Sequence, residues 1–155
     1  KSTVRRINPL DIRRLSQSLV ERSGTRDSIR IATDLGYIIV YAPLNGIRGF
    51  YQYLKRCHII YLDEKLNRPD QQWVCAHELG HSLLHQGYNR IFMDTHTLLV
   101  TSRFEQEADY FASELLFDDM ELECFLEVSL PTAVRTLGMS PLITARRLSS
   151  IRHLP

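Results

Sequence analysis

Residues 77–81 read His77-Glu78-Leu79-Gly80-His81, the pattern His-Glu-x-x-His, and they lie inside a segment with helical periodicity. Helix positions four residues apart lie on one face, so both imidazoles can reach one metal ion. The carboxylate of Glu78 can then act as general base on a water at that metal. A catalytic zinc site has three protein ligands and one open position, so a third ligand is expected elsewhere. The plain alternative is a solvent-facing helix with two ordinary histidines.

The helix that carries this motif has clear start and stop signals. Asn67 is a candidate N-cap, Pro69 suits the first turn, and Asp70 complements the positive end of the helix. Gly87 is expected to end it. Gly80 lies inside the helix, where glycine costs about 1 kcal/mol relative to alanine. We therefore expect it to let a neighbouring helix or a substrate approach closely.

A second strong helix is predicted over residues 102–117, and it offers three acids as the third ligand. Glu105 and Asp109 are four residues apart on a face with small side chains, whereas Glu107 lies about 200° around the helix from Glu105. We predict Glu105 as the ligand, with Glu107 as second choice. Asp109 is expected to orient a ligand histidine. Alternatively, Ser102-x-x-Glu105 is a helix capping box.

The remaining pattern predicts an α+β fold, with a sheet of about three strands packed against the motif helix and the ligand-bearing helix, followed by a C-terminal helical segment. A tight turn at Lys55-Arg56 is expected to join the last two strands. The predicted helices are 9–21, 28–34, 120–128, 131–137 and 142–151, and the predicted strands are 37–41, 49–54 and 58–62, with a possible short one at 98–100.

Composition favours one domain over residues 1–155, divided into a catalytic core, 1–117, and a C-terminal helical extension, 118–155. The chain has 155 residues, of which 44% are hydrophobic, and a net charge of +1. We therefore expect no strong attraction to nucleic acid or membrane, and no apolar run is long enough to span a bilayer. Cys57, Cys75 and Cys124 are scattered, which indicates reduced, buried thiols in a cytoplasmic protein.

Several other polar residues are weaker candidates. His85 follows His81 by four residues and is either a fourth metal ligand, which would close the site, or a histidine with a structural partner, which we favour. Tyr88, His96 and Tyr110 are candidates for stabilising an oxyanion, although a structural role is favoured for each. The loop 86–101 could cover the cleft.

Two segments of the chain, one near each end, are rich in arginine. Near the N-terminus, a solvated helix face is favoured over a binding patch for Arg5, Arg6, Arg13 and Arg14. The C-terminal segment resembles the two helices of a helix-turn-helix. We favour a packing or partner-docking role over DNA contact there, because the preceding segment is acidic; its arginines are Arg135, Arg146, Arg147 and Arg152.

Two motifs together resemble a known family. Residues 76–85 read AHELGHSLLH and residues 105–116 read EQEADYFASELL. This pair is similar to the motifs of the ImmA/IrrE family of metallopeptidases, and the resemblance is strong over residues 36–117. Family members usually continue with Met-Pro, where this chain has Phe117-Asp118, and this departure concerns how the last helices dock.

The resemblance implies His77, His81 and Glu105 as metal ligands and Glu78 as the catalytic acid/base of a gluzincin-like endopeptidase. Zn²⁺ is the expected metal, with Mn²⁺ as an alternative. The implied substrate is a helix-turn-helix repressor of a mobile element or a similar regulatory protein, and strand 51–54 or 59–62 could offer it a sheet edge. The competing hypothesis is a metal-bearing module that binds and titrates its partner without cutting it.

Overall fold

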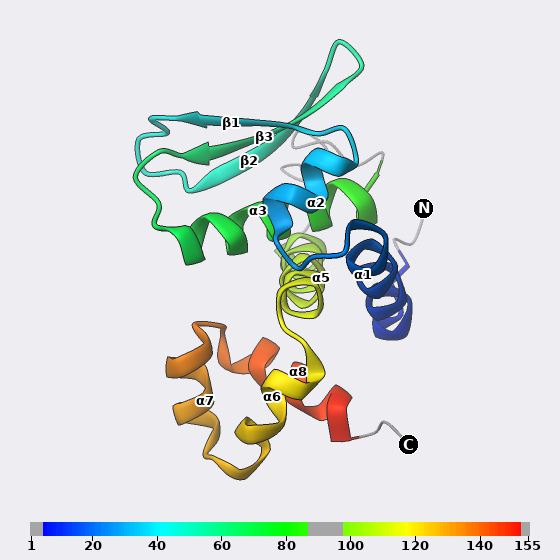
Figure 1. The fold of residues 1–155 in the computed structure, drawn as a ribbon, viewed down its shortest axis with the longest axis vertical. Helices are drawn as coiled ribbons and strands as arrows, with labels where there is room; N and C mark the ends of the chain where they lie inside the picture. The colour runs from blue at the N-terminus through cyan, green and yellow to red at the C-terminus, as the bar shows by residue number, and fades with distance from the viewer. Residues whose placement is uncertain (1–4, 87–97, 153–155) are drawn as a thin grey trace.

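The structure, a computed structural model, describes residues 5–86 and 98–152, without the side chains of residues 98–101. It is an α+β protein, as the sequence predicts, with a three-stranded sheet on one side of the helices (Figure 1). The described elements are, in chain order, α1 (Pro9–Ser23), α2 (Ser28–Asp34), β1 (Ile38–Ala42), β2 (Gly49–Leu54), β3 (Cys57–Asp63), α3 (Arg68–Leu84), α5 (Leu98–Leu116), α6 (Asp119–Leu122), a 3₁₀ helix (Glu123–Glu127), α7 (Leu130–Leu137) and α8 (Pro141–Arg152).

The sheet has β3 at its centre, parallel to β1 and antiparallel to β2. The predicted hairpin between β2 and β3 is confirmed. Lys55 and Arg56 at its turn have positive φ angles of 49° and 64°, as a type I′ turn requires. Ile60 and Leu62 of β3 are fully buried. Because β3 is central, the expectation that residues 59–62 could offer a sheet edge is wrong, whereas β2 is an edge strand.

The motif helix α3 packs against both β2 and β3, and it also packs against α5, so it connects the sheet to the helical part of the fold (Figure 1). Gly49, at the start of β2, marks the closest approach. A Cβ placed there would lie 2.5 Å from Cγ1 of Val74 on α3. The absence of a side chain at Gly49 therefore lets α3 lie directly against the strand.

Helices α3 and α5 pack against each other in the core, and Gly80 lies where they touch. A Cβ at Gly80 would be 2.9 Å from Cδ1 of Phe111 and 3.3 Å from Cα of Ala108. Both of these α5 residues are fully buried. The expectation that Gly80 admits a neighbouring helix is confirmed. The contact sets the distance between α3 and α5, and therefore the distance that a carboxylate on α5 has to span to reach α3.

Four charged side chains join the helical elements at the other end of α5. Arg13 of α1 is ion-paired with Glu114 and Asp119, and Arg147 of α8 donates from Nη1 to Oδ1 of Asp119 at 2.7 Å. Arg13 is only 8% exposed and Arg147 only 1%. The prediction that Arg13 lies on a solvated face is therefore wrong, because it neutralises buried carboxylates. Arg147 has the packing role favoured for its segment.

The residues Phe117-Asp118 form the corner between α5 and α6. The carbonyl of Phe117 accepts from Arg147 at 2.8 Å and from Arg26 at 3.3 Å, which satisfies the end of α5. The carboxylate of Asp118 accepts from the backbone N–H of Met120 and so caps α6. At this corner, side-chain donors and a cap set the direction of the last helices.

Several local predictions are corrected. Leu98–Val100 is the first turn of α5, so the predicted strand there is wrong. Ser102 is already inside α5, so the capping-box interpretation also fails. Helix α3 ends at Leu84 with His85 as its C-cap, whereas Gly87 lies outside the described residues.

The three cysteines differ in their exposure to solvent. Cys75 is buried as predicted, but Cys57 and Cys124 are exposed, which contradicts the expectation of three buried thiols.

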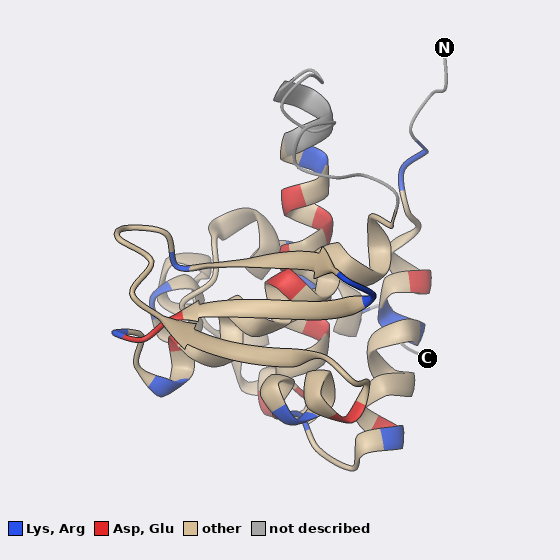
Figure 2. Cartoon of the chain, turned by 90° about the horizontal axis from the view of Figure 1, so that it is seen from above, with Lys and Arg blue, Asp and Glu red and all other residues tan. Residues whose placement is uncertain are grey.

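Acidic and basic residues are interspersed in Figure 2, in agreement with the nearly neutral net charge. Within the described ranges, no helix combines the length and apolarity that a membrane span requires.

Candidate metal centre

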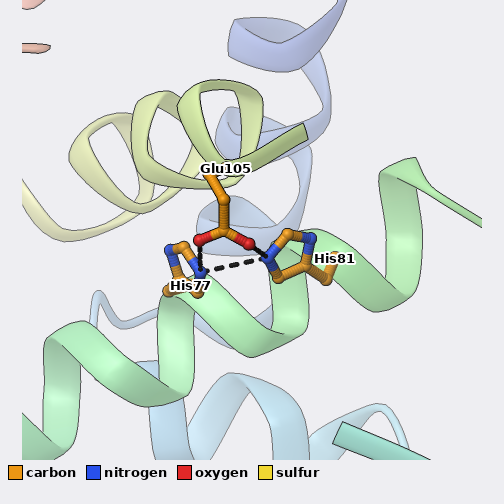
Figure 3. Close-up of side chains that lie close together, drawn as sticks. All are labelled: His77, His81 and Glu105. Carbon is orange, nitrogen blue, oxygen red and sulfur yellow. Dashed lines mark hydrogen bonds and ion pairs between the residues drawn. The ribbon is translucent and has the colours of Figure 1, made fainter. Parts of the chain in front are cut away.

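Helix α3 places His77 and His81 one above the other. Its start is fixed by Asn67, whose side chain accepts from the N–H of Asp70 at 3.0 Å, and by a proline in the first turn. The helix then runs unbroken through the motif. The two imidazoles present their Nε2 atoms toward each other at 3.0 Å (Figure 3).

The carboxylate of Glu105 reaches across from α5 and faces both histidines (Figure 3). Its Oε2 lies 3.1 Å from Nε2 of His77, and its Oε1 lies 2.8 Å from Nε2 of His81. These three side chains each offer a ligand atom, and the ligand atoms all lie within 4.8 Å of one another. The predicted first-choice residues are thus brought together from two helices.

This set of donors suits a zinc ion. Tetrahedral zinc with bonds of about 2.0–2.2 Å keeps its ligand atoms roughly 3.3 Å apart, close to the separations found here. Two imidazoles with one carboxylate match the preference of zinc for mixed nitrogen and oxygen donors, whereas manganese prefers oxygen ligands. The donor set therefore fits a divalent metal ion that accepts mixed nitrogen and oxygen ligands, as zinc does.

Asp109 lies on the far side of the His77 ring from Glu105. Its Oδ1 lies 2.7 Å from Nδ1 of His77, on the opposite side of the ring from Nε2. Burial alone would lower the pKa of His77, but the hydrogen bonds and charges of Asp109 and Glu105 outweigh it and raise that pKa to about 10. A metal would therefore have to displace a firmly held proton.

The electrostatics of the other two residues favour metal binding. Burial lowers the pKa of His81, and the neighbouring His77 and His85 act in the same direction, although Glu105 opposes them. Burial would raise the pKa of Glu105, but hydrogen bonds from His77 and His81 hold it well below its usual range. A neutral imidazole and an ionised carboxylate are the forms that bind a metal.

Glu78 and the second-choice ligand occupy different surroundings. Glu78 follows His77 on α3 and is partly buried. Glu107 is 7% exposed and has its Oε2 3.2 Å from Nε2 of His85. Of the two glutamates considered as ligands, the structure therefore brings only Glu105 to the histidine pair.

His85 is buried beside the cluster and has two polar partners. Its Nδ1 lies 3.0 Å from Nδ1 of His81, on the face of that ring turned away from Glu105. This matches the favoured expectation of a histidine with a structural partner. Its pairing with Glu107 was not predicted, because the two residues are 22 positions apart on different helices; the spacing of four residues from His81 indicated only the contact between the two histidines.

Of the three candidates for oxyanion stabilisation, Tyr110 is the one within the described residues, and it has a partner elsewhere on α5. The hydroxyl of Tyr110 donates to Oε1 of Glu114 at 2.8 Å. Burial and the adjacent Glu114 raise the pKa of this hydroxyl to about 12. Tyr88 and His96 lie outside the described residues, as does most of the loop expected to cover the cleft.

Comparison with known proteins finds similarity that includes the whole cluster. Residues 32–149 match the family model described as the IrrE N-terminal-like domain. The chain is similar to "Uncharacterized immunity region protein 2" of Bacillus phage phi105, with 36% identity over 104 residues, or 66% of each chain. It is also similar to "Metallopeptidase ImmA" of Bacillus subtilis strain 168, with 32% identity over 108 residues, or 68% of this chain and 63% of that protein. The matched region is thus slightly under two thirds of each relative's length.

Proposed function

This chain belongs to the ImmA/IrrE family, through its IrrE N-terminal-like domain, and on that premise we propose that it is a zinc-dependent endopeptidase acting on a regulatory protein. The observation that carries the proposal is the meeting of His77, His81 and Glu105, whose ligand atoms lie within 4.8 Å of one another. The name of the similar ImmA protein, a metallopeptidase, supports the same chemistry.

The proposed mechanism assigns a role to each side chain. His77, His81 and Glu105 hold the ion, and Asp109 fixes the ring of His77 through its Nδ1. When bound, zinc lowers the pKa of a water molecule toward about 7 and polarises a carbonyl group. Glu78 accepts the proton of the attacking water and then delivers it to the leaving amine.

The proposed substrate is a helix-turn-helix repressor or a similar cytoplasmic regulator. The name of the phage relative, an immunity region protein, supports a link to the regulation of a mobile element. The edge strand β2 packs against α3 and is a suitable site for an extended segment of the substrate to pair as an additional strand. We do not assign DNA binding to this chain, since Arg147 is engaged in packing and the net charge is only +1.

The test is incubation with the helix-turn-helix regulator encoded nearest the gene, followed by intact-mass analysis. The samples are the wild type, Glu78→Gln, a chelator-treated wild type, and the matched control Glu21→Gln, which alters an exposed glutamate of α1. A single cut is expected with the wild type and with Glu21→Gln only. A stable complex without cleavage in every sample would leave the competing hypothesis of a module that binds without cutting.

A further inference from the structure

His85 connects the motif helix to a buried carboxylate that the proposed mechanism does not use. Its side chain is 2% exposed, with Nδ1 at 3.0 Å from Nδ1 of His81 and Nε2 at 3.2 Å from Oε2 of Glu107. A hydrogen-bonded line therefore runs from Glu107 on α5, through His85 and His81 at the end of α3, to Glu105 on α5. Glu107 and Glu105 are the two ends of one polar chain.

The chemistry of these groups orders the protons along the line. With Oε2 of Glu107 as the acceptor, the donor in this contact is Nε2–H of His85. With its proton on Nε2, the ring of His85 has a bare Nδ1, which accepts, so the proton in the contact between the two rings belongs to Nδ1 of His81. His81 is left with a bare Nε2, the atom that faces His77 and Glu105.

Two neighbours hold this arrangement in place. Nε of Arg103 lies 3.6 Å from Oε1 of Glu107, the second oxygen of the same carboxylate. The ring of His85 stacks on Phe104 with centroids 4.2 Å apart. The backbone N–H of His85 also donates to the carbonyl of His81 at 3.0 Å, so both its main chain and its side chain are tied to that residue.

We propose that His85 and Glu107 are positioning residues that fix the tautomer and ring orientation of His81, as Asp109 does for His77. One ligand histidine is thus oriented directly by a carboxylate, and the other through an intervening imidazole. The inference rests on the proposed function in one respect, because it takes His81 as a metal ligand through Nε2. It assigns a role to a buried carboxylate that is not itself in the ligand cluster.

The first test measures zinc affinity by competition with a chromophoric chelator. His85→Phe keeps the stacking on Phe104 but removes both nitrogens, and a 10–100-fold higher Kd is expected. His85→Gln offers an amide oxygen toward His81 and an amide N–H toward Glu107, so most of the affinity should return. An unchanged Kd in His85→Phe, or equal losses in the two variants, would overturn the proposal.

A matched pair of carboxylate variants covers the case in which His85→Phe fails to fold. Glu107→Gln replaces an acceptor by an amide that can turn either way toward His85, whereas Glu114→Gln alters another buried carboxylate of α5 that is bound by Arg13 and Tyr110. Zinc affinity should fall several-fold in Glu107→Gln and stay within about twofold in Glu114→Gln. Equal affinities in this pair would contradict the proposal.

A direct measurement of the tautomers completes the test. Two-bond ¹H–¹⁵N spectra of the zinc-loaded protein should show the proton of His81 on Nδ1 and that of His85 on Nε2. A proton on Nδ1 of His85 would overturn the inference, since the line of donors would then run the other way. If the wild type itself binds no zinc, the proposed function fails; if it binds zinc and His85→Phe binds equally well, only this inference fails.

Discussion

Gly80 of α3 and Phe111 of α5 are in such close contact that a single methyl group would not fit between them. A Cβ at Gly80 would lie 2.9 Å from Cδ1 of the Phe111 ring, which is fully buried. The same approach brings Glu105, on α5, within hydrogen-bonding distance of the histidines on α3. The glycine inside the motif therefore sets the distance between the two helices that hold the cluster.

Replacing Gly80 by alanine tests this relationship. In an isolated helix the change would stabilise by about 1 kcal/mol, but here overpacking should cost about 1–3 kcal/mol and dominate. We expect a lower unfolding free energy in urea for the metal-free protein and weaker zinc binding. Combining Gly80→Ala with Phe111→Leu should recover part of both losses, because the shorter side chain relieves the contact. Additive losses in the double variant would contradict the explanation.

The two glutamates of α5 can be distinguished by their effect on the metal. Glu105→Ala removes a proposed ligand and should abolish measurable zinc binding, whereas Glu107→Gln should weaken it only several-fold. Equilibrium dialysis with metal analysis of both variants provides the comparison. If Glu107→Gln loses zinc and Glu105→Ala retains it, the ligand assignment has to be exchanged.

Asp109 should influence the metal through His77. Asp109→Ala removes the acceptor for Nδ1 and should raise the Kd for zinc by about 10–100-fold, while Asp109→Asn, which keeps an oxygen acceptor, should lose less. The chelator competition assay gives both values, and urea unfolding of the metal-free proteins controls for general destabilisation. Zinc affinity that does not change in Asp109→Ala would remove this residue from the proposed site.

Local signals in the sequence were sufficient for most of the fold and for the cluster. The hairpin turn at Lys55-Arg56 and the N-cap of α3 are encoded by neighbouring residues, and the spacing of Glu105 and Asp109 places both on one helical face. The strand predicted over Leu98–Val100 is wrong because a short apolar run that ends in the β-branched Val100 does not by itself distinguish a strand from a helix, while its place at the start of α5 follows from the longer helix. Short-range patterns are reliable where the structure itself depends on short-range contacts.

The buried charges could not be predicted in the same way. Arg13 and Glu114 are 101 positions apart in the chain, and nothing near either residue indicates the pairing. Arg13 belongs to an arginine-rich segment that is typical of a solvated face, yet it is buried because α1 crosses α5 at the carboxylates. Such contacts depend on the completed packing of several helices, and this packing has no local sequence signal.

The ion cluster at the end of α5 predicts how stability depends on pH. Burial would raise the pKa of Asp119, but hydrogen bonds and charges from Arg13 and Arg147 lower it below its ordinary value of 3.8. A carboxyl whose pKa is lower in the folded state binds its proton more readily when unfolded, so its contribution is complete well above pH 3.8 and is lost as the pH falls through the folded-state value. Asp119 should therefore stabilise the protein at neutral pH and progressively less in acid.

Asp119→Asn should remove this contribution, at a cost of about 1–2 kcal/mol at pH 7, less than the roughly 1.5–3 kcal/mol of a fully buried charged hydrogen bond because the carboxylate is partly solvated. Urea unfolding at pH 7, 5 and 3.5 measures it. The difference between wild type and variant should stay constant from pH 7 to 5 and shrink at pH 3.5. Asp11→Asn is the matched control, since Asp11 and its partner Arg14 are both exposed. A difference between wild type and Asp119→Asn that grows in acid would show that Asp119 is not held ionised by the two arginines.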